Sequence, residues 1–301
     1  MTGFINSHQG EFAALLTAFL WTVSAFAFES ASKKIGSLAV NIFRLLIGLV
    51  FLSIFNLIIR GRILPVDAAS HNWIWLSLSG LVGFVFGDLF LFKSYTIIGS
   101  RFSMLIMTLV PPITTFFSWV MIGEKLKMIH FLGMTLTFCG IAIAIVSMNG
   151  EGEKLSLKLA PSGIFYALGG AIGQALGMVL SKIGIGDYNP FAATQIRIIA
   201  GIAGFIILAT LLSRWGSIFK AARNSKGMAA TTLGAFFGPF LGVSFSLISV
   251  RLTEAGIAAT IMAIVPVLII PPAVILYKQK VTLAEIAGAV ISVTGVAVFF
   301  M

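Results

Sequence analysis

Five charged residues lie within or at the edges of long apolar stretches of this 301-residue chain: Glu29, Arg44, Asp88, Lys93 and Arg197. A charge at the centre of a membrane-spanning helix costs about 2.5–3.5 kcal/mol on insertion scales, so it is expected to be functional or paired. One interpretation is a paired cluster in the headgroup region, with the basic side chains reaching towards water. The other is a gate or a carboxylate-binding site that faces a cavity, with Arg197 as its counterpart in the second half of the chain.

Asp88 is the deepest acid of this group and the best candidate for a carboxyl group that takes up and releases a proton. A basic partner such as Lys93 or Arg44 would instead hold it ionised, because a nearby opposite charge favours the charged form. Both roles stay open at this point.

Prolines interrupt two of the apolar stretches, at Pro111-Pro112 and at Pro266. Proline has no N–H, so it frees a backbone carbonyl in the preceding turn, and broken helices at membrane depth are tolerated where they are buried in protein or line a cavity. Because the two prolines recur in both halves, we expect Pro111 and Pro266 to serve a gate or a cavity, with a packing kink as the alternative.

Polar and aromatic residues recur at helical spacing and predict which helix faces meet a cavity. We expect a substrate-binding set of Trp21, Ser24, Met107, Pro111, Gln174, Met262 and Pro266. Apolar, Met-containing walls suit a relaxed specificity for apolar amino acids or for lipophilic cations.

The elements that position these residues are membrane helices. Hydrophobic residues make up 58% of the chain and charged residues 10%, whereas soluble domains have about 25% charged residues. The apolar runs are continuous and about 20 residues long, as membrane helices require, and do not alternate as barrel strands do. We therefore predict an all-α polytopic membrane protein with ten spans: 11–32, 39–59, 72–94, 101–122, 128–148, 162–182, 190–212, 227–249, 255–277 and 281–301.

The second half of the sequence repeats the first. At an offset of 155, Pro111 matches Pro266, Gly133 matches Gly288 and Gly140 matches Gly295, while Arg44 matches Arg197 at an offset of 153. Five spans in each half would make the second half enter the membrane in the opposite sense. We therefore predict two inverted five-helix repeats, 1–150 and 151–301, that form one unit with a site near the middle of the membrane.

Several short motifs in this order resemble the EamA-type repeat of the drug/metabolite transporter superfamily: Leu20-Trp21, Asn41 to Arg44, Ser94-Tyr95, Leu109 to Pro111, Gly123 to Leu126, and Gly133 with Gly140. The resemblance covers nearly the whole chain, although the second half lacks the tryptophan and replaces Gly-Glu-Lys by Lys278-Gln279-Lys280. It implies export or exchange of small metabolites, with amino acids prominent, by alternating access that is often coupled to protons.

Other classes of function find little support in the residues. The net charge of +10 comes from Lys and Arg in the breaks between spans, where topology-setting charge belongs, so we expect no nucleic-acid partner. The three histidines lie at span ends, and Cys139 is the one cysteine. We therefore expect no metal, no cofactor and no enzymatic activity, but a monomer in the lipid bilayer, with the bacterial inner membrane as the expected location.

The prediction is a secondary transporter that exports small metabolites, foremost neutral or aromatic amino acids, with protons as a second partner. The alternatives are efflux of lipophilic cations and a facilitator or channel for small metabolites. The count of Lys and Arg favours termini outside the cell, whereas the family is usually drawn with cytoplasmic termini, so the orientation stays open.

Overall fold

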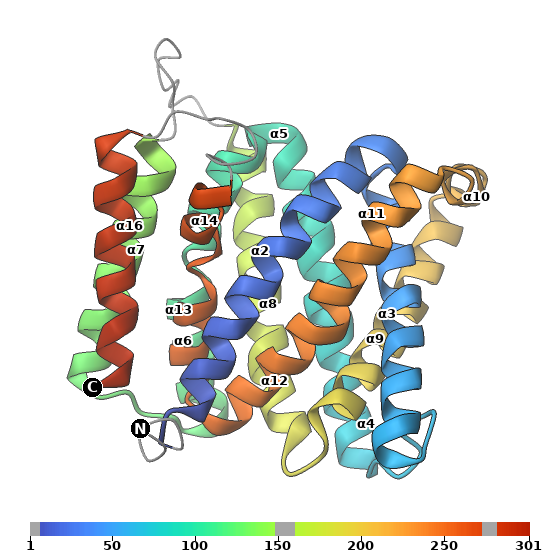
Figure 1. Cartoon of the computed structure of the whole chain (residues 1–301), viewed down its shortest axis with the longest axis horizontal. Coiled ribbons are helices and arrows are strands. Elements are labelled where there is room, and N and C mark those ends of the chain that lie inside the picture. The colour runs from blue at the N-terminus through green and yellow to red at the C-terminus, as the bar shows by residue number, and fades with distance from the viewer. Residues whose placement is uncertain (1–6, 148–159, 273–281) are drawn as a thin grey trace.

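The computed structural model describes residues 7–147, 160–272 and 282–301, apart from side chains at a few positions in α2, α5 and α7 that include Glu29. Every regular element in these ranges is a helix, and the long helices run roughly side by side (Figure 1). Six of them are uninterrupted: α2 (Gln9–Ile35), α3 (Ser37–Arg60), α7 (Met128–Ser147), α8 (Pro161–Ile185), α9 (Pro190–Leu211) and α16 (Leu283–Ala297), which ends in the 3₁₀ turn η3 (Val298–Phe300).

The remaining helices are interrupted or short. Two continuous helical stretches contain a π-helical turn. The first consists of α4 (Ser70–Gly80), η1 (Leu81–Gly87) and α5 (Asp88–Met107). The second consists of α11 (Ser225–Ala235), η2 (Phe236–Gly242) and α12 (Val243–Leu252). The others are α6 (Val110–Ile122), α10 (Trp215–Ala222), α13 (Ala255–Met262) and α14 (Val265–Leu268).

Within the described ranges, nine helices are long and apolar enough to cross a membrane. The predicted span 101–122 is divided instead, because α5 ends at Met107 and α6 is only 13 residues long. The count of ten therefore stays a prediction.

A break predicted at residues 95–100 is wrong, since α5 runs through it without interruption. The stretch contains glycine but no proline, and one glycine costs a helix only about 1 kcal/mol. The breaks at Gly36, Gly61 and Gly123 are confirmed, with φ of 80°, 67° and 70°, a backbone conformation that glycine adopts without steric cost.

Three elements escaped the sequence analysis. The π-helical turns η1 and η2 begin at Leu81 and Phe236, which differ by the same offset of 155, and such turns cluster at functional sites. The loop predicted at 213–226 holds the short helix α10, whose Ile218 is buried while Phe219 is exposed.

Residues that the repeat relates to each other also contact each other where the two halves of the chain meet. α7 packs closely on α16: a Cβ at Gly288 would lie 2.6 Å from the carbonyl oxygen of Gly140, and one at Gly295 would lie 2.7 Å from that of Gly133. Ser292 Oγ donates a 3.4 Å hydrogen bond to the carbonyl oxygen of Thr137, its own equivalent at an offset of 155. This helix pair lies at one edge of the bundle (Figure 1).

Large apolar side chains cover the outside of the bundle. Ile58, Leu211 and Leu283 are 73%, 77% and 85% exposed, as expected of residues that contact lipid rather than water. Inside, one apolar cluster joins α2, α12, α13 and α16, and another joins α3 and α9 with Phe240.

Candidate substrate cavity

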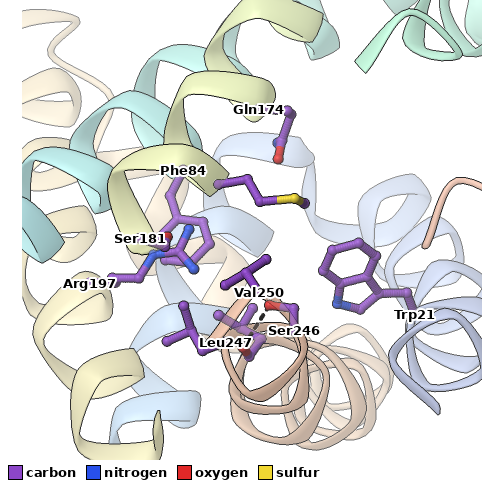
Figure 2. A pocket seen from close by; sticks show the side chains of 10 residues that line it. Trp21, Phe84, Gln174, Ser181, Arg197, Ser246, Leu247 and Val250 are labelled. Atoms are coloured by element: carbon purple, nitrogen blue, oxygen red, sulfur yellow. Dashed lines mark hydrogen bonds between the residues drawn. The ribbon is translucent and has the colours of Figure 1, made fainter. Parts of the chain in front are cut away.

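A cavity lies among α2, η1, α8, α9 and α12, so both halves of the chain supply its walls (Figure 2). The space open to the centre of a water-sized sphere is about 40 Å³, which is room for about three water molecules. Its lining mixes polar and apolar side chains: Trp21, Phe84, Gln174, Met178, Ser181, Arg197, Val243, Ser246, Leu247 and Val250.

Trp21 and Gln174 hold matching places in the two halves. They differ by the offset of 153 that also relates Arg44 to Arg197. The indole of Trp21 packs against Gly242 and the backbone of Gln174 against Gly87, and these two glycines are themselves 155 residues apart. The tryptophan that the sequence analysis found missing near Gly170 is therefore replaced by Gln174.

Arg197 brings a positive charge to this cavity. The residue is 7% exposed, and its guanidinium carbon lies 4.8 Å from the centre of the Phe84 ring. Its Nε is fully buried without a hydrogen-bond partner, and no acidic side chain among the described residues forms an ion pair with it. A buried charge without a partner is costly, so this arrangement calls for an explanation.

Arg44 has the partner that Arg197 lacks. Its Nη2 forms an ion pair with Asp88 Oδ2, and Gln174 Nε2 donates a 3.0 Å hydrogen bond to Asp88 Oδ1. The guanidinium of Arg44 also lies 5.5 Å from the centre of the Phe28 ring. Asp88 is thus tied to α3 and α8.

The other two residues of the predicted charged cluster in the first half are Lys93 and Glu29. Lys93 is exposed in α5, and the side chain of Glu29 lies outside the described part of α2. In the second half, Asp187 pairs with Arg251 at 3.2 Å on the surface and not with Arg197. The structure therefore joins Arg44 with Asp88 and sets Arg197 on the cavity.

Five of the predicted binding residues do not line this cavity. Ser24 is buried and donates to the carbonyl oxygen of Trp21, while Met107 and Met262 end α5 and α13. Pro111 and Pro266 stand in the first turns of α6 and α14, directly after the breaks at Thr108-Leu109 and Ala263-Ile264. A substrate role for these residues stays a prediction.

The sequence analysis missed more than half of the lining. Met178 follows Gln174 by one turn of α8, so the polar face of that helix was a signal for it. Phe84, Val243, Ser246, Leu247 and Val250 gave no such signal, because they belong to η1 and α12 and take their direction from the π-helical turns.

A polar network joins the helix ends on the side of the termini. Lys182 Nζ pairs with Glu124 Oε1 and donates to the carbonyl oxygen of Thr253 at 2.5 Å. Thr253 Oγ1 donates to Glu11 Oε1 at 2.8 Å, and Glu124 Oε2 accepts the 2.9 Å hydrogen bond of the Ala255 N–H at the start of α13. We call these residues the terminus-side network; it ties α2, α8 and α13 to the loop before α7.

Comparison with known families identifies the architecture around this cavity. The EamA-like transporter family matches residues 8–146 and again residues 161–301. This chain belongs to the EamA-like transporter family. This family is one of transporters, and the nine described helices that are long and apolar enough to cross a membrane fit it.

Two curated relatives come from Bacillus subtilis (strain 168). The uncharacterized transporter YvbV is 24% identical over 62% of this chain and 58% of its own length. The uncharacterized transporter YoaV is 30% identical over 44% of this chain and 45% of its own length. The match thus spans about half the length of these relatives.

One solved crystal structure shares the fold of this EamA-like transporter. It superposes with a TM-score of 0.75 over 97% of this chain and 95% of the other, at 19% identity.

In the described ranges no three His, Cys, Asp or Glu side chains gather as a metal site would require.

Proposed function

We propose that this EamA-like protein is a secondary transporter that exports small metabolites, foremost neutral and aromatic amino acids, through the cavity of Figure 2. The observation that carries the proposal is that both halves line one cavity, with Trp21 and Gln174 at matching places. Transporters built from repeats place their substrate sites at the interface between the repeats. The proposed functional unit is a monomer.

Alternating access is supported by the terminus-side network and by the small size of the cavity. The terminus-side network joins four segments with charged hydrogen bonds, which are stronger than neutral ones. The cavity has room for about three water molecules, so a metabolite requires the helices to move apart. The helix breaks before Pro111 and Pro266 and the π-helical turns are the sites at which such a movement costs least.

The inverted repeat is supported by the recurring contacts and by the helix directions. α2 and α8 begin 152 residues apart, and α8 begins at the end of the bundle away from the termini (Figure 1). Cysteines introduced at Ser7 and Ala160 in a Cys139→Ala background test this architecture with a reagent that does not cross membranes. Inverted repeats require labelling of these two sites from opposite sides, and labelling from the same side would refute them.

Amino acids are favoured over lipophilic cations because no acid among the described residues lines the cavity. Asp88, the nearest predicted carboxylate, is bound by Arg44 and Gln174, whereas a lipophilic cation would need an unpaired acid at depth. A facilitator or channel remains the second candidate, because a polar lining serves both. The proposed location is the bacterial cytoplasmic membrane, in line with the bacterial relatives.

Flux into proteoliposomes tests the proposal with a panel of labelled amino acids, with and without an imposed pH gradient. We expect saturable movement of neutral or aromatic amino acids that falls strongly in Trp21→Ala. A response to the gradient would make protons a coupled partner, and movement indifferent to pH would make the protein a facilitator. Absence of saturable movement for every amino acid would refute the proposed substrate class.

A further inference from the structure

Arg44 and Arg197 occupy matching places in the two repeats, but only Arg44 has an acidic partner among the described residues. Arg44 is neutralised by Asp88, the first residue after η1. The residue at the same place after η2 is Val243, which lines the cavity beside Arg197. The second half therefore keeps the arginine and lacks its carboxylate.

Nothing else among the described residues takes over the role of that carboxylate. The Nε of Arg197 is buried without a partner, and the guanidinium carbon lies 4.8 Å from the centre of the Phe84 ring. Asp88 attracts Arg197 electrostatically but forms its ion pair with Arg44. A guanidinium in this setting binds a carboxylate strongly, because its N–H donors are fixed in a planar fork that matches two carboxylate oxygens.

We infer that Arg197 binds the carboxylate of the transported metabolite and that the substrate supplies the negative charge that Val243 does not. The inference rests on the proposed transport function for the identity of its ligand, and it deepens that function by naming the group that is recognised. The indole N–H of Trp21 is a second donor at the cavity, without a hydrogen bond among the described residues. The amide oxygen of Gln174 points towards the same space (Figure 2), since its nitrogen is held by Asp88.

The charges of the groups at the cavity make the carboxylate of the substrate essential for binding and its ammonium group dispensable. A positive charge and an indole N–H favour the anion, whereas Gln174 offers a neutral oxygen to an ammonium group. A 2-oxo acid that has the side chain of a transported amino acid should therefore bind, and the corresponding amide should not.

The experiment measures thermal unfolding of the purified full-length protein in detergent with three compounds that share one phenyl ring. Phenylalanine has both groups, phenylpyruvate has the carboxylate alone, and phenylalaninamide has the ammonium group alone. We expect the two carboxylates to raise the unfolding temperature and to bind at least about 10-fold more tightly than the amide, because a hydrogen-bonded charge is lost with the amide. Equal stabilisation by the amide, or no stabilisation by either carboxylate, would overturn the inference.

Variants separate binding by Arg197 from a structural role. Arg197→Met removes an unpaired buried charge, so we expect it to raise the stability without ligand and to abolish the carboxylate-dependent shift, whereas a structural arginine would lower that stability. Val243→Asp restores the pattern of Arg44 with Asp88 and should occupy Arg197 from within, which also abolishes the shift. Val243→Asn is equal in size to Val243→Asp but neutral, so it is the matched comparison and should reduce the shift less than Val243→Asp does.

The test does not depend on one variant folding, because Arg197→Met removes the positive charge whereas Val243→Asp neutralises it with a carboxylate. Retention of the carboxylate-dependent shift in either folded variant would overturn the inference. Carboxylate binding without transport of any amino acid would refute the proposed function and leave the inference standing. Transport of amino acids that is unchanged in Arg197→Met would refute the inference and leave the proposed function standing.

Discussion

Glu124 and Lys182 form an ion pair that joins the loop before α7 to the last turn of α8. Their side chains are 13% and 20% exposed, so the pair is shielded from water more than a surface pair is. Both residues also hold the backbone near the start of α13, at Ala255 and Thr253. The pair is thus the centre of the terminus-side network.

We predict that Glu124→Gln opens the cavity towards the side of the termini. Without the Glu124 carboxylate the network loses the ion pair with Lys182 and the charged hydrogen bond from the Ala255 N–H, so the helix ends separate more often. The measurement is the rate at which a thiol reagent labels Ser246→Cys, in the cavity, from that side in a Cys139→Ala background. The rate should rise several-fold.

A matched control is available on the same side. Asp187 and Arg251 form an ion pair at 3.2 Å in which Asp187 is fully exposed, and such pairs contribute little. Asp187→Asn should leave the labelling rate unchanged. Equal rates in Glu124→Gln and the parent protein would show that the network does not close this side.

Asp88→Asn is predicted to destabilise the fold. Removing the carboxylate leaves Arg44 buried without its ion pair, a loss that typically costs about 3–5 kcal/mol. The double variant Asp88→Asn with Arg44→Met should recover much of the unfolding temperature, because no uncompensated charge is then left. A proton-carrying Asp88 would instead give a normally folded single variant whose transport ignores a pH gradient.

Close packing of α7 against α16 predicts the effect of adding one methyl group. A Cβ at Gly288 would lie 2.6 Å from the backbone nitrogen of Ala144, so Gly288→Ala forces the two helices apart and should lower the unfolding temperature. Gly216 in α10 has no neighbour within 4 Å of a built Cβ. Gly216→Ala should therefore be neutral or raise stability by about 0.5–1 kcal/mol, and similar losses in both variants would refute the close contact.

These predictions depend partly on features that the sequence already indicated. The apolar runs predicted membrane helices, and fixed offsets between glycines and prolines predicted the equivalences that the contacts of Gly140 and Gly288 follow. Trp21, Gln174 and Arg197 were recognised because polar or charged residues in apolar helices need a reason.

The rest of the site depended on geometry that a helical period does not describe. A π-helical turn shifts every following side chain around the helix axis, so the direction of Phe84 or Ser246 could not be read from a spacing of 3.6 residues. The pairing of Asp88 with Arg44 rather than Lys93 depended on which helices pack together, and the sequence alone left both open.

The loops on the side of the termini predict a pH dependence of stability. Burial raises the pKa of Asp67, but hydrogen bonds from Tyr188 and Arg60 outweigh it and lower the pKa from its ordinary value of 3.8. A lowered pKa stabilises the fold above pH 3.8, and this contribution disappears as the pH falls through the lowered value. Asp67→Asn should therefore unfold at a lower temperature than the parent protein at pH 6, with a difference that shrinks below pH 3.8. A difference that is constant with pH would contradict the role of the charge.

The most direct test of alternating access is an exchange measurement in proteoliposomes. Labelled phenylalanine is added outside vesicles that hold none or an excess of unlabelled phenylalanine. Alternating access through one cavity predicts saturable uptake that the internal substrate accelerates, because the loaded cavity returns with cargo. Uptake that rises linearly with concentration and ignores the internal substrate would contradict it and identify a channel.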